Sequence, residues 1–501
     1  MTTPTSDAPS TLDRLAPNLW LQLAGSAVAL GLLADLLFKD AALGLNAPLW
    51  IGALIAAFVL AARRSATPIG KLSTSLLAAS LALSIMITWR AADTLQILLL
   101  VTSASLLLLA LVARDDSHAR RASITLFFGS LLVAAIAAVK GTFQLASSAP
   151  WRQWFDQGAQ RQMQSVGHAA LIATPLVFIF GALFFAADAV FETWIKDSLT
   201  FDLTSLPGHL AWLLGGAAAA AGLLWSGLAT QQDAPSGPRL ADERRLRSIE
   251  TGVVLGSLVS LFALFVIIQV QYLFGGGEHV QASTGLTYAD YARRGFFELV
   301  AVAALLLPVL LATDWARARN WRSLTTFRIL GGLLVLLLIV VIASAFQRLN
   351  IYMDIYGLTP LRLYVAAALV WLAAVFLWLL WSLLKERRDQ FVIGAVLTAL
   401  VALVLLVAIN PHATVAATNL ARADQGREFD VPHALGLSAD ATPTLITGLD
   451  LLPDEDACQI ASTMLERWDN PELELRSWNW ARTSAREAVE SHRDALQAAC
   501  S

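Results

Sequence analysis

The feature that most constrains this chain is a series of unbroken apolar runs of about 18 residues or more, the length needed to cross roughly 30 Å of hydrocarbon. Residues 333–346, LLVLLLIVVIASAF, have no polar face and therefore do not suit a surface helix of a soluble protein. Inside a bilayer each segment must pair its own backbone groups, so these runs predict helices. Composition agrees, because 57% of residues are hydrophobic and only 15% are charged. The expected fold class is an all-α, polytopic transmembrane bundle.

The apolar segments define the predicted organisation, with about 11–13 spans. They lie near residues 18–38, 46–62, 72–89, 94–113, 123–140, 168–188, 208–229, 250–274, 295–313, 326–346, 359–384 and 391–410. We therefore expect a polar N-terminal tail at 1–17, a transmembrane domain at 18–410 and a soluble helical tail at 411–501.

Several polar stretches fall outside the predicted spans. Residues 143–166 and 189–206 mix aromatic with charged residues and are expected to lie in the membrane interface. Residues 231–247 resemble a polar linker. In the tail, 454–468 and 481–500 have the periodicity of short amphipathic helices. In the seventh apolar segment, GGAAAAAG at 215–222 favours close helix packing.

Basic loops suggest an orientation, because short cytoplasmic loops carry an excess of Lys and Arg. Basic clusters follow the second, fourth, seventh, ninth and eleventh apolar segments. The first two clusters follow even-numbered segments and the last three follow odd-numbered segments, which would place them on opposite sides of the membrane. Either one segment between the fourth and seventh is therefore miscounted, or one loop breaks the rule. The three consecutive later loops favour a cytoplasmic location for themselves and an extracytoplasmic tail.

The two cysteines, Cys458 and Cys500, both lie in the tail. A pair confined to one soluble segment suits an oxidising compartment, so a disulfide between them is expected. The alternative is that two unrelated cysteines lie there by chance.

Familiar catalytic patterns are absent from the sequence, including phosphate loops, His-Glu-x-x-His, Gly-x-Ser-x-Gly and Cys-x-x-Cys. The seven histidines are scattered, and none pairs at the spacing of a helical metal site. The net charge of −3 does not favour nucleic acid as a partner. We therefore expect no enzyme activity, no catalytic residue, no cofactor and no metal.

A charged stretch precedes the ninth apolar segment. Thr287 and Asp290 have the spacing of a capping box, so a helix is expected to start there. Asp290, Arg294 and Glu298 follow at four-residue steps on one helix face. An unpaired Glu298 carboxylate in lipid would cost a few kcal/mol, which Arg294 can offset. The stretch is thus either an orienting ion pair or part of a ligand site.

Alternation of the spans brings more polar residues to the same membrane face. The eighth, tenth and twelfth apolar segments end there, and the ninth and eleventh begin there. Thr359 is expected to cap the eleventh segment, with Pro360 in its first helical position. The predicted ligand-binding cluster consists of Gln269, Tyr272, Asp290, Arg293, Arg294, Glu298, Arg348 and Arg362.

Four motifs suggest a family resemblance. They are QVQYLFGGGEHV, GLTYADYARRGFFELV, SAFQRLNIYMDIYGLTPLRLY and LSADATPTL, the last followed by RSWNWAR. Over roughly residues 180–480 the chain resembles uncharacterised multi-pass bacterial membrane proteins, domain of unknown function 4173 or the related 4153. The resemblance implies an inner-membrane location and no established activity or catalytic residue. Gln271 stands where that family more often has a basic residue.

Two functions stay open at this point. One is a transporter or channel-like protein with its polar site on the extracytoplasmic face. The other is a non-transporting sensor, scaffold or regulatory component that acts through a partner. The expected partners are the lipid bilayer and a protein partner or second copy of the chain; a small-molecule ligand is not identified.

Overall fold

A computed structural model describes residues 17–65, 68–112, 139–145, 206–229, 248–274, 296–317, 320–385, 387, 390–469 and 474–500. The helices before the tail are α1 (Pro17–Phe38), α2 (Asn46–Arg64), α3 (Lys71–Met86), α4 (Asp93–Val112), α10 (Leu206–Ala229), α11 (Ser248–Phe274), α14 (Phe296–Ala316), α15 (Trp321–Tyr356), α16 (Pro360–Leu384) and α17 (Phe391–Ile409). These helices coincide with ten of the predicted apolar segments and confirm the all-α, polytopic fold class. The predicted segment 168–188 and most of 123–140 lie outside the described residues.

Within the described part of the chain, seven helices are long and apolar enough to cross a membrane, or eight if the bent pair α17–α18 is one span. The chain is therefore a membrane protein with several spanning helices. The predicted total of about 11–13 spans also includes segments that are shorter or not described.

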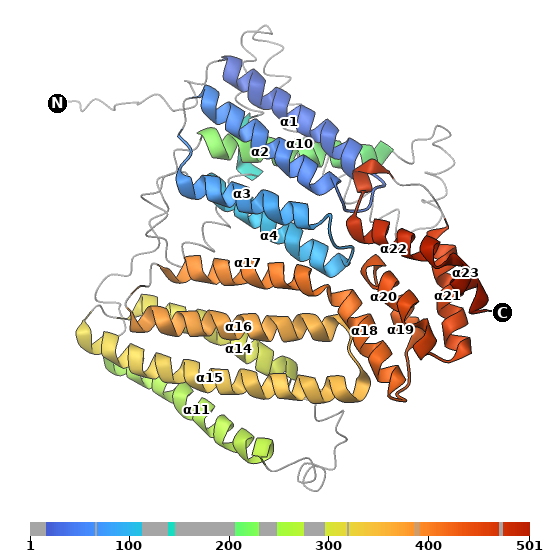
Figure 1. The fold of residues 1–501 in the computed structure, drawn as a ribbon. Helices are drawn as coiled ribbons and strands as arrows, with labels where there is room; N and C mark the ends of the chain where they lie inside the picture. Colours follow the sequence, from blue (N-terminus) through green and yellow to red (C-terminus); the bar gives the residue numbers. More distant parts are fainter. Residues whose placement is uncertain are drawn as a thin grey trace, which may run out of the picture.

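The membrane helices pack around three apolar clusters. One joins α1, α2, α4 and α10, and another joins α11, α14, α15 and α16. A third cluster links α3 and α4 to α17, through residues such as Leu99 and Val407. The bundle has two halves: α1 to α4 with α10 form the first, and α11 with α14 to α16 form the second. Helix α17 lies between these two halves (Figure 1).

Small residues let α1 and α10 approach closely, as the run GGAAAAAG predicts. A Cβ atom at Gly31 would overlap the Leu213 carbonyl oxygen, and one at Gly216 would lie 2.6 Å from the Ala34 Cβ. The two helices are antiparallel, because His209 near the start of α10 pairs with Asp35 near the end of α1. Close helix packing at this run is confirmed.

The antiparallel α1–α10 pair also bears on the conflict between the basic loops. Since α10 begins beside the end of α1, it ends near the start of α1, as do α2 and α4 (Figure 1). All five predicted basic loops therefore follow helices that end on the side of the bundle away from the tail. The predicted segments between α4 and α10 lie almost wholly outside the described residues.

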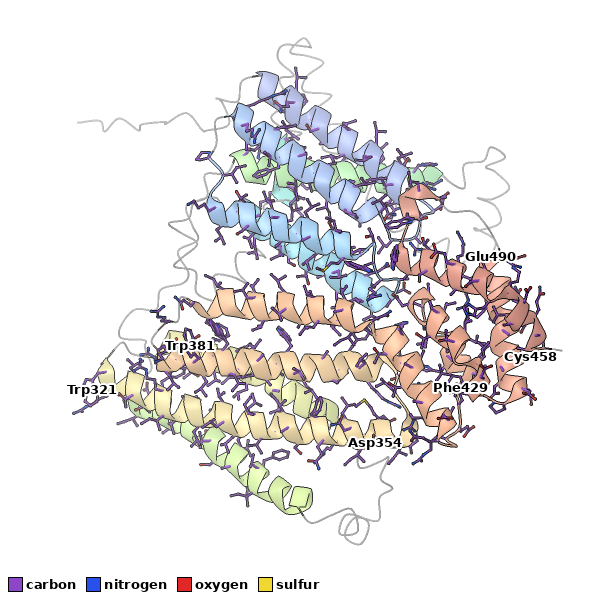
Figure 2. The ribbon with its side chains drawn as sticks, in the orientation of Figure 1. Trp321, Asp354, Trp381, Phe429, Cys458 and Glu490 are labelled. Atoms are coloured by element: carbon purple, nitrogen blue, oxygen red, sulfur yellow. A yellow bond between two sulfur atoms is a disulfide. The ribbon has the colours of Figure 1, made fainter. Side chains whose placement is uncertain are left out.

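The tail forms a helical domain at one end of the bundle (Figure 1). Its helices are α18 (Pro411–Asp424), α19 (Val431–Leu435), α20 (Thr442–Thr447), α21 (Asp454–Trp468), α22 (Trp480–Ser491) and α23 (Arg493–Ala498), with 3₁₀ turns at Ala439–Ala441, Leu449–Leu451 and Leu475–Ser477. Asn410, with φ 55°, ends α17 and caps α18, and the chain bends there by 50°. A disulfide joins Cys458 on α21 to Cys500 just beyond α23 (Figure 2).

Two helices differ in length from the sequence-based expectation. The segment predicted at 326–346 belongs to α15, which continues to Tyr356. Apolar content alone misses this extension, because its end is held by polar contacts with the tail. The predicted helix 481–500 is divided at His492 into α22 and α23.

The α1–α10 contact generates a test with a matched control. Gly216→Ala should lower the free energy of unfolding by about 1–3 kcal/mol, because its new methyl group would press on Ala34. Gly215→Ala should be neutral or slightly stabilising, since a Cβ there meets no atom within 4 Å. Thermal unfolding of the purified protein measures both. Equal behaviour of the two variants would mean that α1 and α10 are not in close contact.

Candidate functional site

The structure describes only part of the predicted ligand-binding cluster. Asp290, Arg293 and Arg294 lie outside the described residues. Gln269 and Tyr272 lie near the end of α11, and Glu298 lies in the first turn of α14. The structure describes the backbone of these three residues and not their side chains. Their assignment to a ligand site therefore stays a prediction.

Arg362 has a local role at the link between α15 and α16. Its Nη1 donates to the carbonyl oxygens of Tyr356, at 3.1 Å, and Gly357. Its guanidinium lies over the Tyr352 ring, 4.3 Å from the centroid. Arg348 lies about two turns before the end of α15.

The start of α16 agrees with the sequence in detail. The Thr359 side chain accepts a hydrogen bond from the Arg362 N–H at 3.4 Å, and Pro360 occupies the first helical turn. Both features were predicted from the residues GLTPLR. The cap fixes the direction in which α16 leaves the tail side of the bundle.

The same link is bound to α18 of the tail. The Asn419 side chain accepts from Leu358 N–H and donates to the Leu358 carbonyl oxygen, at 2.9 and 2.8 Å. Arg422 donates to the carbonyl oxygens of Asp354 and Ile355, at 2.6 and 3.2 Å. Leu358 itself belongs to the apolar core of the tail. This part of the bundle and the tail therefore share one core.

Asp440 of the tail is a buried carboxylate, whose side chain is 0% exposed. One carboxylate oxygen accepts from Ala91 N–H at 2.7 Å and from the Ser438 hydroxyl at 2.9 Å. The other lies 3.7 Å from Arg90 Nη1 and accepts no hydrogen bond within the described residues. A buried carboxylate requires such pairing, because desolvation of its charge is costly. Asp440 of the tail is thus bound to the loop between α3 and α4.

That loop, residues 87–92, is held from three directions. Arg90 Nε donates to the Val407 carbonyl oxygen in the last turn of α17, at 2.7 Å. Gln96 of α4 donates to the Arg90 carbonyl oxygen at 2.6 Å. Asn479 of the tail donates to the same oxygen at 3.0 Å and to the Ile87 carbonyl oxygen at 2.9 Å. The loop therefore joins the two halves of the bundle to the tail.

Two ring side chains, those of His412 and Tyr364, lie near Asp440. His412 Nδ1 accepts a hydrogen bond from Ser438 N–H at 2.9 Å, so this nitrogen must be unprotonated. Burial lowers the pKa of the His412 imidazole below its ordinary value; Asp440 and Asp93 oppose the shift, and His433 adds to it. The Tyr364 hydroxyl is buried near Asp440 and has no hydrogen-bond partner among the described residues. Together these side chains form the junction cluster: Arg90, Tyr364, His412, Ser438, Asp440 and Asn479.

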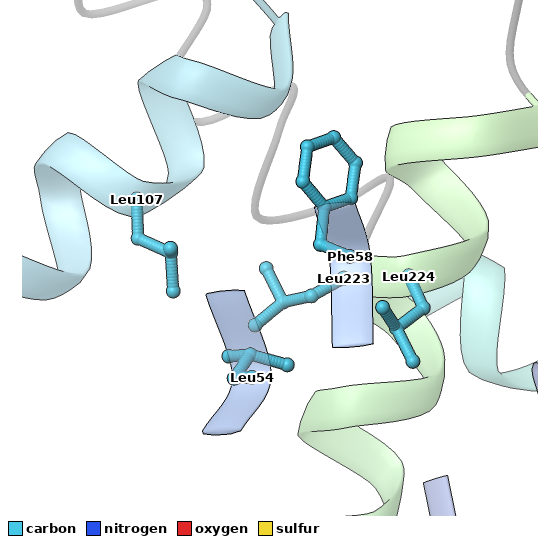
Figure 3. Close-up of a pocket in the computed structure, with 5 residues that line it drawn as sticks. All are labelled: Leu54, Phe58, Leu107, Leu223 and Leu224. Atoms are coloured by element: carbon cyan, nitrogen blue, oxygen red, sulfur yellow. The ribbon is translucent and has the colours of Figure 1, made fainter. Parts of the chain in front are cut away.

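The contacts of the junction cluster attach the tail to the loop between α3 and α4. Within the described residues, no group of three His, Cys, Asp or Glu side chains could hold a metal ion. A pocket in the bundle, lined by Leu54, Phe58, Leu107, Leu223 and Leu224, is wholly apolar, with a volume of about 10 Å³ (Figure 3). This is about the space of one water molecule, so it does not suit a metabolite.

The junction cluster shares no residue with the ligand-binding cluster predicted from the sequence. Arg90 lies just beyond the predicted apolar segment 72–89, and Asp440 lies in the predicted soluble tail. Three of its members nevertheless lie in the family motifs, because LSADATPTL contains Ser438 and Asp440, and RSWNWAR contains Asn479. These motifs supported only the family resemblance, since their contacts with residues 87–92 are not visible in a sequence.

Removing the Asp440 charge should weaken the attachment of the tail. Asp440→Asn strands Arg90 and should lower the free energy of unfolding by about 3 kcal/mol. Combined with Arg90→Ala, it should cost less than the sum of the single changes. Thermal or denaturant unfolding in detergent measures the cycle, with the exposed Asp450→Asn as control. Strictly additive costs would mean that the pair does not interact.

Acid should weaken the same attachment through His412. Because its folded pKa is lowered, stability is complete above the ordinary value of 6.5 and falls as the pH decreases toward the folded pKa. His412→Gln can keep an acceptor for Ser438 N–H without titrating. The melting temperature of this variant should therefore fall less between about pH 7.5 and pH 5 than that of the parent. The exposed His492→Gln should retain the full pH dependence of the parent.

Comparison with known proteins identifies the family but not an activity. The sequence profile described as Domain of unknown function (DUF4153) matches residues 77–448, more than half of the chain. No curated protein and no solved structure matches the chain. The matched residues include α4, α10 to α17 and the tail up to Asp440 and α20. The chain belongs to the DUF4153 family.

Proposed function

We propose that this protein is a non-transporting component of a bacterial inner membrane, whose C-terminal domain is held rigidly on the extracytoplasmic face and acts through a protein partner or a second copy of the chain. The junction cluster is the observation that carries this proposal. A flexible linker would be enough to anchor a domain, whereas this domain is bound both to the loop between α3 and α4 and to the link between α15 and α16.

The proposed orientation rests on charge and on the cysteines. Described basic residues of the loops far from the tail include Arg63, Arg64, Arg317, Lys385 and Arg387. An excess of such residues favours the cytoplasmic side, which would leave the tail outside. The Cys458–Cys500 disulfide suits the same assignment, since disulfides persist in oxidising compartments.

A transporter or channel-like function has less support. In the described membrane helices, the ionisable side chains lie toward the helix ends, as Asp35, Glu250, Arg348 and Arg362 do. A pathway for a polar solute usually has ionisable or polar groups near the middle of the bilayer. The polar pair Ser80–Ser103 is satisfied by its own hydrogen bonds and joins α3 to α4.

Reconstitution distinguishes the two functions. Purified protein in liposomes should produce no flux of ions or small solutes above that of empty liposomes. In cells, a photocrosslinking residue at an exposed tail position such as Glu487 should give a discrete crosslinked product. Asp440→Asn, which loosens the tail, should reduce that product, whereas Asp450→Asn should not. Reproducible solute flux from the reconstituted protein would instead favour a transporter.

The orientation has a separate test in cells. A reporter that is active only outside the cytoplasm should be active when fused after Ser501. The tail cysteines should label with a thiol reagent only after reduction. Breaking their bridge should cost about 4 kcal/mol of tail stability in the chain-entropy model. A fusion active only in the cytoplasm, or labelling that is equal with and without reductant, would contradict an extracytoplasmic, bridged tail.

A further inference from the structure

A short segment of the tail, residues 474–480, carries unusually exposed apolar side chains. Leu475 is 77% exposed and Trp480 is 51% exposed. Between them, Asn479 is fully buried at 0%. An exposed leucine and tryptophan on either side of a buried anchor suggest that this segment faces something other than water.

Hydrogen bonds fix the segment at the level of the helix ends. Arg476 Nη1 donates to the Leu36 carbonyl oxygen in the last turn of α1, at 2.8 Å. Trp480 N–H donates to the Thr88 carbonyl oxygen just beyond α3, at 2.7 Å. The Trp478 carbonyl oxygen accepts from Leu45 N–H before α2, at 3.0 Å. The segment is therefore held at the adjoining ends of α1, α2 and α3.

Steric contact with the loop between α1 and α2 also restricts the position of residues 474–480. A Cβ atom on Gly44 would overlap the carbonyl oxygens of Ser477 and Trp478. The segment therefore lies directly against the loop between α1 and α2. The segment cannot move toward the bundle unless this loop also moves.

Neighbouring side chains have the character of a membrane interface. Trp89 is 53% exposed, Trp212 is 43% exposed, and the Trp212 ring stacks on Phe38 with centroids 5.2 Å apart. Leu36 of α1 is 65% exposed, as expected of a lipid-facing residue. Tryptophan is enriched where acyl chains meet headgroups, because its ring is apolar and its N–H is polar. Exposed tryptophans on the opposite end, such as Trp321 and Trp381, form the matching belt (Figure 2).

We infer that residues 474–480 are an interfacial element of the tail, with Leu475 and Trp480 inserted at the boundary between acyl chains and headgroups. The partner of this surface is the lipid bilayer. The Arg476–Glu474 ion pair, with 2.7 Å between Nε and Oε2, remains at the headgroup level. The inference does not depend on the proposed function, because the segment meets a bilayer on whichever side the tail lies.

Depth-dependent quenching tests the element in the full chain. Leu475→Cys is labelled with the fluorophore NBD, with the native disulfide left intact, and the protein is reconstituted in phosphatidylcholine vesicles. Ser462→Cys, at an exposed position on α21, is the matched control. We expect nitroxide groups near the lipid headgroups to quench the label at residue 475 several-fold more than the label at residue 462. Aqueous iodide should show the reverse preference.

Two outcomes would overturn the inference. Equal quenching by iodide at both positions would mean that residue 475 lies in water. A blue-shifted label at residue 475 that neither quencher reaches would mean that protein, such as a second copy of the chain, covers the segment. Trp480→Cys provides a second label site if Leu475→Cys does not fold, and the same outcomes apply to it.

Discussion

The junction between tail and bundle depends on one buried charge. Asp440 has no exposed side-chain surface, so its carboxylate must obtain from the protein the stabilisation that water would have supplied. It obtains this from Ala91 N–H, the Ser438 hydroxyl and the Arg90 guanidinium. Two of these three partners belong to the loop between α3 and α4. The charge is therefore stable only when tail and bundle are together.

This dependence unites elements far apart in the sequence. Arg90 also donates to Val407 in α17, and α17 packs against α4 between the two halves of the bundle. On the other side of the tail, Leu358 places the link between α15 and α16 in the tail core. A chain that ended after α17 would lose partners at both places. The tail is thus part of the same folded unit as the membrane helices.

Local physical rules predicted a large part of this structure. Apolar runs identified ten described helices, Thr359 and Pro360 identified the start of α16, and the small residues near Gly216 identified close packing. Each of these signals acts within one segment or one helix turn. The junction cluster has no such signal, because Arg90 and Asp440 are brought together only by the tertiary fold. Grouping polar residues by membrane face selected the helix ends of α11, α14, α15 and α16, and not the loop between α3 and α4.

The most constrained side chain at the junction is Asn479. Its Oδ1 accepts from Ala481 and Arg482 N–H groups and so starts α22. Its Nδ2 donates to the Ile87 and Arg90 carbonyl oxygens and so holds the α3–α4 loop. Aspartate or serine could cap the helix but could not donate both bonds to the loop, and glutamine is too long for the usual cap geometry. Among these residue types only asparagine meets both requirements, so Asn479 couples the start of α22, beside the exposed Trp480, to the loop between α3 and α4.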